Sequence, residues 1–189
     1  MANISGLIIL GCWVIFATYW LISAMRTKAI AERQSVWSAL VHRIPLGFSY
    51  VLLAVRHLPP PLNLSVTPHA DWVRAIGILV CALGLLVTLR ARGTLAGNWS
   101  NDVTFKQGHE LIRTGPYRFV RHPIYTGILA MCLGTALDIG QLRGWLALPL
   151  MTIAFWIKLK QEERLLLRHF PNDYLTYQKQ VKALVPFVI

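Results

Sequence analysis

The sequence predicts an all-α fold, a polytopic membrane bundle of about five transmembrane helices. Of the 189 residues, 55% are hydrophobic and only 14% are charged, whereas soluble domains have about 25% charged residues. The hydrophobic residues gather in long uncharged runs, and the seven Trp are typical of membrane–water interfaces. Lys and Arg outnumber Asp and Glu by 19 to 8, which in such a chain indicates membrane topology and no nucleic-acid partner. At this length we expect one membrane-embedded domain, residues 1–189.

Three transmembrane helices are expected in residues 1–90. Residues 6–25 carry no charge and would span about 30 Å as a helix, the thickness of the hydrocarbon core. Because this run is too long for a signal-peptide core and has no basic leader, we expect it to remain as an anchor. Residues 36–55 predict a second, less apolar helix and residues 72–89 a third. The four prolines in HLPPPLNLSVTPHAD, between these two, predict an irregular surface loop.

Two ionisable residues, His42 and Arg43, fall inside the second predicted helix. Ionisable residues within a membrane span are costly and are therefore functional candidates. If the helix instead begins near Ile44, both are ordinary interface residues. We favour this second interpretation.

The second half of the chain begins with a long polar connection and continues with two short apolar runs. The connection, residues 90–122, is rich in glycine and basic residues, and long structured loops are usually functional. The apolar runs, residues 123–137 and 144–157, are 15 and 14 residues long. Each is marginal for a full crossing, so we expect a short helical hairpin. After Lys158 the pattern predicts amphipathic helices broken at Pro171.

The distribution of Lys and Arg orients the bundle. Fifteen of them lie in the segment after the first helix, in the long polar connection and in the C-terminal tail, whereas only Arg56 and Arg143 lie on the opposite side. The positive-inside rule then places the N-terminus outside, and the polar connection and the tail together on the cytoplasmic face.

The densest polar motif is GPYRFVRHPIYTG, where the polar connection enters the fourth helix. Pro123 suits the first turn of a helix, so Arg118, Arg121 and His122 would cluster at a helix N-terminus, which suits an anionic ligand group. The alternative is a basic membrane anchor followed by a helix start.

Adjacent acids, Glu162 and Glu163, make up a quarter of all the acidic residues. Either they balance the charges of Lys160 and Arg164, or they accept hydrogen bonds from ribose hydroxyls or an amino group. The cysteines lie singly in apolar runs without ligand spacing, and we interpret them as small core residues and expect no metal site: Cys12, Cys81 and Cys132.

The two motifs together resemble a known family. RHPIYTG followed by EERLLLRHFPNDYLTYQKQV is similar to the integral-membrane methyltransferases related to isoprenylcysteine carboxyl methyltransferase, which carry R-H-P-x-Y-x-G and E-E-x-x-L…F-x-x-x-Y-x-x-Y. The resemblance covers residues 94–189, and the first ninety residues match only in being transmembrane. Phospholipid N-methyltransferases, methanethiol S-methyltransferases and sterol reductases share the arrangement more weakly.

The resemblance implies a cytoplasmic S-adenosylmethionine pocket in the catalytic half, residues 91–189, without a Rossmann domain. The lack of any G-x-G-x-x-G motif agrees with this. The implied cofactor-binding residues are Leu111, Tyr117, His122, Tyr125, Gly127, Glu162, Glu163, Tyr174 and Tyr177. The implied catalytic residues are Arg90, Arg121, His122 and Glu163, and the implied substrate-binding residues are Arg92, Asn98 and Trp99. Arg118, His122, Glu162 and Glu163 are expected in one pocket.

The implied acceptor is lipophilic, a prenylcysteine-like acid that enters from the bilayer, with membrane lipids as the other partner. The family has an Arg shortly after its tyrosine pair, where this chain has Gln180. Lys179 or Lys182 could supply that charge, although a lysine does not reproduce a bidentate arginine. The alternatives are a phospholipid amine or small thiol methyltransferase, a nicotinamide-dependent oxidoreductase of the sterol-reductase kind, and a non-catalytic membrane protein.

Overall fold

The computed structural model describes residues 4–25, 27–55, 57–68, 70–100 and 102–186. Its helices are α1 Ile4–Ala24, α2 Val36–Ala54, α3 Asp71–Leu95, α4 Pro123–Ile139, α5 Leu142–His169 and α6 Pro171–Gln180. Two short strands, β1 Ile30–Arg33 and β2 Thr104–Lys106, pair antiparallel. The all-α prediction is confirmed for the bundle, but it omitted this small sheet. Arg26 and Arg56, which enter the charge distribution, lie outside the described residues.

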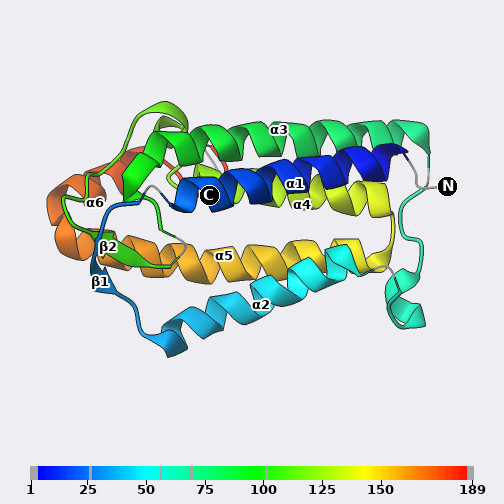
Figure 1. Ribbon diagram of the computed structural model, residues 1–189, viewed down its shortest axis with the longest axis horizontal. Helices are drawn as coiled ribbons and strands as arrows, with labels where there is room; N and C mark the ends of the chain where they lie inside the picture. Colours follow the sequence, from blue (N-terminus) through cyan, green and yellow to red (C-terminus); the bar gives the residue numbers. More distant parts are fainter. Residues whose placement is uncertain (1–3, 26, 56, 69, 101, 187–189) are drawn as a thin grey trace.

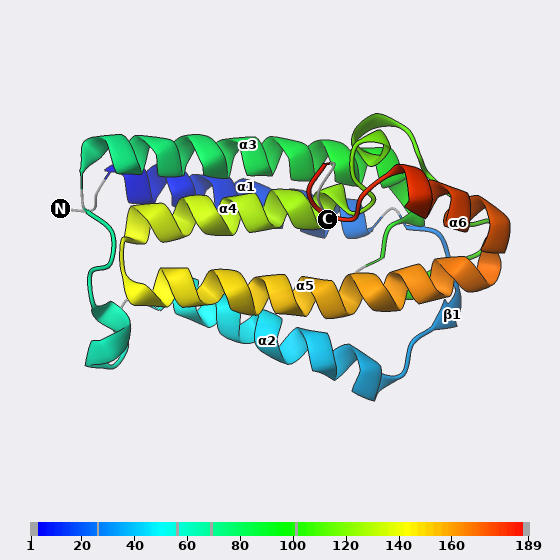
Figure 2. The ribbon, with the colours of Figure 1, turned by 180° about the vertical axis from the view of Figure 1, so that it is seen from behind.

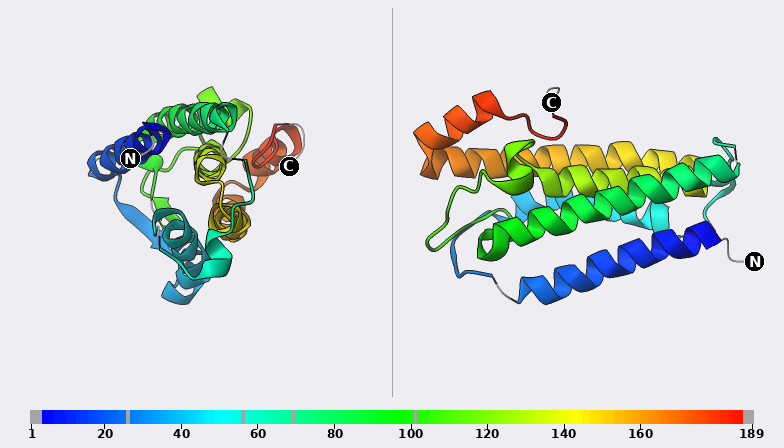
Figure 3. Two further views of the ribbon diagram at one scale, coloured as in Figure 1. Left: turned by 90° about the vertical axis from the view of Figure 1, so that its right-hand side faces the viewer. Right: turned by 90° about the horizontal axis from the view of Figure 1, so that it is seen from above.

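The five long helices run side by side in the order α1, α3, α4, α5, α2, so that α4 lies between α3 and α5 (Figures 1 and 3). Of the described segments, Ile4–Ala24, Val36–Ala54, Asp71–Asn98 and Leu142–His169 are long and apolar enough to cross a membrane. The fourth helix is shorter, at 17 residues. Figure 2 shows that β1 and α6 lie at one end of the bundle and the N-terminus at the other. We call the end that carries α6 the polar end.

Glycines bring α3 and α4 into backbone contact. A Cβ on Gly134 would lie 2.4 Å from the carbonyl oxygen of Gly77, and one on Gly127 would lie 2.6 Å from that of Gly84. Gly77 and Gly84 are seven residues apart on α3, and Gly127 and Gly134 are seven residues apart on α4. Both contacts therefore lie along one face of each helix, and the two helices run antiparallel. Small residues let membrane helices approach closely enough for van der Waals contact to hold them together.

The last helix of the expected hairpin is much longer than predicted. α5 runs unbroken for 28 residues, through Glu162 and Glu163 to His169, whereas the hydropathy pattern predicted an end near Ile157. The segment after the apolar run consists of strong helix formers and has no Gly or Pro before Pro171. The helix therefore continues beyond the apolar run, and the two acids lie within it and not at its exit.

α2 also begins earlier than we favoured. Ser35 caps it, because the Ser35 hydroxyl accepts a hydrogen bond from the Ser38 backbone N–H at 3.3 Å. His42 is therefore inside the helix and only 2% exposed. Arg43 faces outward and forms an ion pair with Asp102. The interpretation of both as interface residues ahead of the helix is wrong. The third helix likewise extends beyond residue 89, and ends at Leu95 where Ala96 adopts a φ of 46°.

Candidate active site

A cavity lies at the polar end, between the start of α4, the outer half of α5, α6 and residues 98–112. Its empty volume is about 860 Å³, including the open mouth. The sequence-predicted residues that line it are Asn98, Trp99, Leu111, Tyr117, Arg121, His122, Tyr125, Glu162, Tyr174 and Tyr177. The two motifs are thus brought together as the topology predicted.

The RHP motif is held in place by the C-terminal tail. A short 3-10 turn, Gly115–Arg118, starts with Gly115 in the left-handed region at φ 58° and precedes α4. The backbone N–H groups of Arg121 and His122 then donate to the carbonyls of Lys182 and Ala183, at 2.8 and 2.9 Å. Since these bonds fix the main chain before Pro123, both side chains are directed toward α5.

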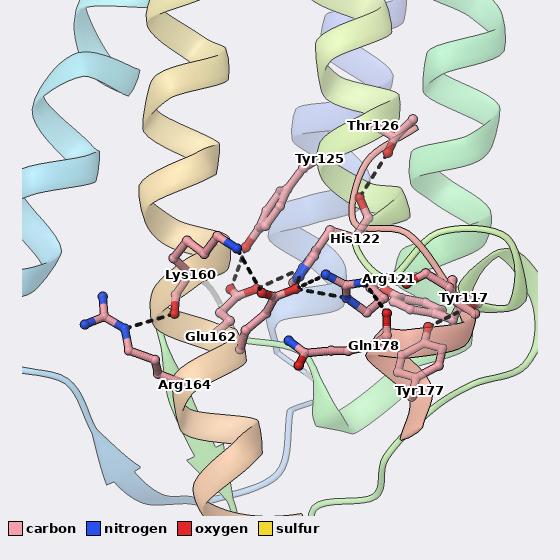
Figure 4. Close-up of polar contacts among 12 residues, drawn as sticks. Tyr117, Arg121, His122, Tyr125, Thr126, Lys160, Glu162, Arg164, Tyr177 and Gln178 are labelled. Atoms are coloured by element: carbon pink, nitrogen blue, oxygen red, sulfur yellow. Dashed lines mark hydrogen bonds and ion pairs between the residues drawn. The ribbon is translucent and has the colours of Figure 1, made fainter. Parts of the chain in front are cut away.

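Arg121 joins α5 to the end of α6. Its Nε and Nη2 atoms donate to Oε1 of Glu163, at 2.9 and 2.6 Å. Its Nη1 atom donates to the carbonyls of Gln178, at 3.4 Å, and Val181 (Figure 4). Both members of the ion pair are less than a tenth exposed. Glu163 lies behind the cavity and does not line it, in contrast to Glu162.

His122 lies between the two carboxylates. Nε2 is 3.4 Å from Oε1 of Glu163, and Nδ1 is 3.5 Å from Oε2 of Glu162. Burial alone would lower the pKa of His122, but the hydrogen bonds and charges of the two glutamates outweigh it and raise that pKa above its usual value. The two carboxylates therefore favour the protonated form of the imidazole.

Tyr125 completes this polar layer. Its hydroxyl donates to Oε1 of Glu162 at 2.5 Å. Its ring stacks between the rings of His122, at 5.5 Å, and Phe155, at 4.6 Å. Glu162 is thus oriented by hydrogen bonds on both of its oxygens, and this fixes the direction in which the carboxylate meets the cavity.

The tyrosine pair of α6 closes the side opposite α5. The Tyr177 hydroxyl donates to the carbonyl of Tyr117, and the Tyr174 and Tyr177 rings meet edge to face at 6.0 Å. Burial raises the pKa of Tyr177 to about 12, so the hydroxyl remains a donor. These contacts bind α6 to the turn before α4, and leave aromatic surface toward the cavity.

Of the three residues expected to bind the substrate, Asn98 and Trp99 line the cavity and Arg92 does not. Trp99 lines the cavity, and the Arg92 guanidinium lies 4.3 Å above its ring. Arg92 is 2% exposed and donates to the carbonyls of Ser23, at 2.7 Å, and Ala96, at 2.8 Å. Oδ1 of Asn98 accepts from Nζ of Lys28 at 3.0 Å. Arg92 thus links the end of α1 to Trp99.

Five sequence-predicted residues do not line the cavity, namely Arg92 and Glu163, described above, and Arg90, Gly127 and Arg118. Arg90 is exposed on α3, two positions from Arg92 and therefore on another face of the helix. Gly127 faces α3, where its missing Cβ leaves room for Thr88. Arg118 is exposed, with its guanidinium 4.5 Å above the Phe119 ring. The expected pocket therefore contains His122 and Glu162, with Glu163 directly behind them, but not Arg118.

Sequence reasoning missed three polar residues around the cavity. Lys158 is 8% exposed, and its Nζ lies 5.4 Å from the centre of the Tyr125 ring. Its position four residues before Glu162, on the same face of one helix, was the available signal. Oγ1 of Thr104 and Nδ1 of His109 are buried and have no hydrogen-bond partner within the described residues, although both residues line the cavity. Buried polar atoms normally have partners, so the cavity suits a polar ligand.

Comparison with known proteins identifies the family. Residues 72–173 match the family model described as phospholipid methyltransferase. A protein-S-isoprenylcysteine O-methyltransferase of Tribolium castaneum is 33% identical over 123 residues, which cover 62% of this chain and 43% of that protein. One of Saccharomyces cerevisiae is 29% identical over 119 residues, covering 60% and 48%.

A solved structure has the same fold. The eukaryotic intramembrane Ras methyltransferase ICMT, an isoprenylcysteine carboxyl methyltransferase, superposes with a TM-score of 0.53 at 27% identity, covering 80% of this chain and 51% of that one. The chain thus spans about half the length of that protein and somewhat less of the two curated relatives. Because the matched model spans more than half of this chain, the chain belongs to the phospholipid methyltransferase family.

Proposed function

We propose that the protein is an integral-membrane methyltransferase that uses S-adenosylmethionine and acts on a lipophilic acceptor, a prenylcysteine-like carboxylic acid. The observation that carries the proposal is the buried Arg121–His122–Glu162–Glu163 cluster at the edge of the cavity. The named activity of the relatives supports it.

The cavity offers groups that suit an adenosyl cofactor. Glu162 can accept hydrogen bonds from ribose hydroxyls or from the cofactor's amino group, while Thr104 and His109 add polar atoms that lack partners in the described structure. Trp99 lines the cavity, and its aromatic ring can face a cationic sulfonium. When bound, the cofactor supplies the electrophilic methyl group and its own leaving group.

The protein's contribution is then to position the reactants and exclude water. The two carboxylates that flank His122 raise its pKa and so favour its protonated form over the free base that would remove a proton from an acceptor. A carboxylate acceptor needs no general base, whereas an amine or a thiol must lose a proton. The surroundings of His122 therefore favour the acid among the acceptor classes.

The cation that would orient an acceptor carboxylate is among the buried residues beside the cavity. Gln180, Lys179 and Lys182, near where the family has its arginine, are exposed and do not line the cavity. Arg92 and Lys158 are buried and contact the rings of Trp99 and Tyr125, which do line it. We assign the acceptor's head group to the part of the cavity next to these two rings.

The proposed topology follows from the charges. The polar end carries most of the Lys and Arg, so it would face the cytoplasm, with the N-terminus of α1 outside. The cofactor would then reach the cavity from the cytosol and the acceptor from the bilayer.

Titration of the purified protein in detergent with S-adenosylhomocysteine and with NADPH tests the proposed function. We expect saturable binding of S-adenosylhomocysteine that weakens about ten- to a hundredfold in Glu162→Gln, because charge-assisted hydrogen bonds contribute about 1.5 to 3 kcal/mol. Binding of NADPH instead would indicate an oxidoreductase. Binding of neither would leave the cluster as a purely structural feature.

A further inference from the structure

A second cavity lies beside the first, in the part of the polar end that the proposed reaction does not use. It is lined by Glu32, Gln34, Ser38, Val103, Gln161, Arg164, Leu165 and Arg168, and its empty volume is about 490 Å³ including the mouth. Val103 and Leu165 line both cavities and are 3% and 6% exposed. These two side chains form the wall that separates them.

Two buried side-chain atoms of residues that line this second cavity lack a partner within the described residues, the Nε2 donor of Gln34 and the Oε1 acceptor of Gln161. Oε1 of Gln34 accepts from the Ser38 hydroxyl at 3.4 Å, which fixes the orientation of the Gln34 amide. Its Nε2 atom is then buried with no hydrogen-bond partner among the described residues. Leaving a buried donor unpaired costs about 1 to 3 kcal/mol, so its presence at a cavity points to an acceptor that comes from outside the chain.

The charged groups around this donor are mainly cationic. Arg164 and Arg168 lie one turn apart on α5 and both line the cavity. The single acid there, Glu32, is shared between Nη1 of Arg168, at 3.2 Å, and Nε2 of His169, at 2.9 Å. The two guanidinium groups and the Gln34 amide N–H outnumber the acceptors, which are the shared carboxylate of Glu32 and Oε1 of Gln161. Arginine is the residue best suited to phosphate.

The position of the cavity relates it to the membrane surface. It lies at the ends of α2 and α5 that connect to β1 and α6, where the two helices diverge (Figure 1). Trp37 and Val41 on α2 and Trp156 on α5 are large apolar residues left exposed next to it, at 80%, 55% and 40%. Basic pockets between transmembrane helices at the membrane surface bind anionic lipid head groups.

We propose that this second cavity binds the phosphate of an anionic phospholipid. The phosphodiester oxygens accept from Gln34, Arg164 and Arg168, while the acyl chains lie along the exposed apolar residues of α2 and α5. The lipid is a bound partner and not the methyl acceptor, because Val103 and Leu165 separate it from the cavity of Glu162. The proposal does not depend on the proposed function.

Native mass spectrometry of the full chain in detergent, titrated with dioleoylphosphatidylglycerol, tests the proposal. We expect one lipid to be retained, and Gln34→Glu to weaken its binding about tenfold, because the unpaired donor is replaced by an anion. The matched control is Gln107→Glu, the same change at an exposed position outside both cavities, for which we expect no effect. Equal loss in the two variants would overturn the proposal.

A second pair of variants tests the arginines. Arg164→Gln with Arg168→Gln should weaken binding at least as much as Gln34→Glu. Arg118→Gln with Lys179→Gln removes the same charge from exposed positions outside both cavities and should leave binding unchanged. If the arginine variant does not fold, as judged by helical circular dichroism, the single change at Gln34 decides the question.

The source of the phosphate is tested by competition. Excess sodium phosphate should not displace the lipid, and dioleoylphosphatidylcholine should be retained more weakly than the phosphatidylglycerol. Displacement by sodium phosphate would show that the cavity takes a soluble anion, and equal retention of both lipids would show that charge plays no part. Either result would overturn the assignment to an anionic phospholipid.

Discussion

At the scale of single residues, the paired acids have different surroundings despite their adjacency. Glu162 lines the cavity and is oriented by Tyr125 and His122. Glu163 lies behind it and neutralises Arg121, which in turn binds the end of α6. One acid is therefore placed to contact a ligand, and the other to hold the C-terminal helix against the bundle.

We expect the two amide substitutions to separate these roles. Glu163→Gln leaves a buried guanidinium without its counter-charge, and breaking a buried ion pair costs about 3 to 5 kcal/mol, so the free energy of unfolding should fall by that order. Glu162→Gln should lower the unfolding free energy less than Glu163→Gln, because the Glu162 side chain is 25% exposed and has no guanidinium partner among the described residues. It should mainly reduce affinity for S-adenosylhomocysteine. Thermal unfolding and calorimetric titration of both variants measure the two effects. Similar losses of stability in both would contradict the assignment.

The pKa of His109 predicts acid sensitivity. Burial, followed by the charges of Lys28, His169 and Lys106, lowers it to about 4. Between about pH 6.5 and 4 the unfolded chain therefore binds a proton that the folded chain does not, so stability is full above pH 6.5 and falls as the pH decreases. We expect a loss of roughly 1 to 3 kcal/mol across that window. Between about pH 6.5 and 4 the unfolding midpoint of the wild type should fall by more than that of His109→Gln, and parallel curves would show that other groups cause the loss.

The sequence predicted which motifs meet, but not which side chain of a helix faces the site. Arg121, His122 and Glu162 follow from the motifs and from the common end of the hairpin. Arg90 and Arg92 differ by two positions, which is about 200° around a helix. Without the packing partners of α3, nothing in the local sequence selects the phase that buries Arg92 and exposes Arg90. For the same reason, the sequence did not show that Gly127 faces α3 and not the cavity.

At the scale of elements, hydropathy predicted the start of each apolar run better than the end of its helix. α3 and α5 both continue beyond the apolar segment, to Leu95 and His169. Hydropathy reports the part of a helix that is in lipid, whereas hydrogen bonding continues for as long as the residues favour a helix. The extension of α5 is what places Glu162 and Glu163 at the cavity.

The seam between α3 and α4 should be intolerant of a single methyl group. A Cβ at residue 127 would lie 2.1 Å from Oγ1 of Thr88, and one at residue 134 would lie 2.4 Å from the Gly77 carbonyl oxygen. Overpacking of this kind costs about 1 to 3 kcal/mol or more, so Gly127→Ala and Gly134→Ala should lower the unfolding midpoint in detergent. Gly47→Ala is the control, because its Cβ would meet nothing within 4 Å.

That measurement also decides what Gly127 contributes. If it serves helix packing, Gly127→Ala and Gly134→Ala should destabilise the protein to a similar degree, although only Gly127 belongs to the RHP motif. If Gly127→Ala keeps the unfolding midpoint and loses only affinity for S-adenosylhomocysteine, Gly127 contributes to cofactor binding and not to helix packing.

At the scale of the whole molecule, composition and long apolar runs were enough to predict a membrane bundle. The order of its helices was not predictable, because the same apolar residue types face the lipid and the neighbouring helices. α1 and α2 are far apart in the observed order, yet both reach the cavity end, α1 through Ser23 and Trp20 near Trp99, and α2 through Arg43 at Asp102. The half of the chain with no family motif thus contributes contacts at Trp99 and Asp102, on the lining of the cavity.

The proposed arrangement predicts that acceptor affinity depends on the length of the apolar chain. In the proposed arrangement the head group lies next to the rings of Trp99 and Tyr125, which Arg92 and Lys158 contact, and the tail lies in the bilayer or between helices. Affinity should rise by about 0.8 kcal/mol for each buried methylene until the apolar space is filled. Acceptors with one carboxylate head group and increasing alkyl or prenyl length, assayed in one detergent and corrected for micelle partitioning, measure this. Methylation of short water-soluble acceptors as efficiently as long ones would exclude entry from the bilayer, and would favour a small-molecule acceptor.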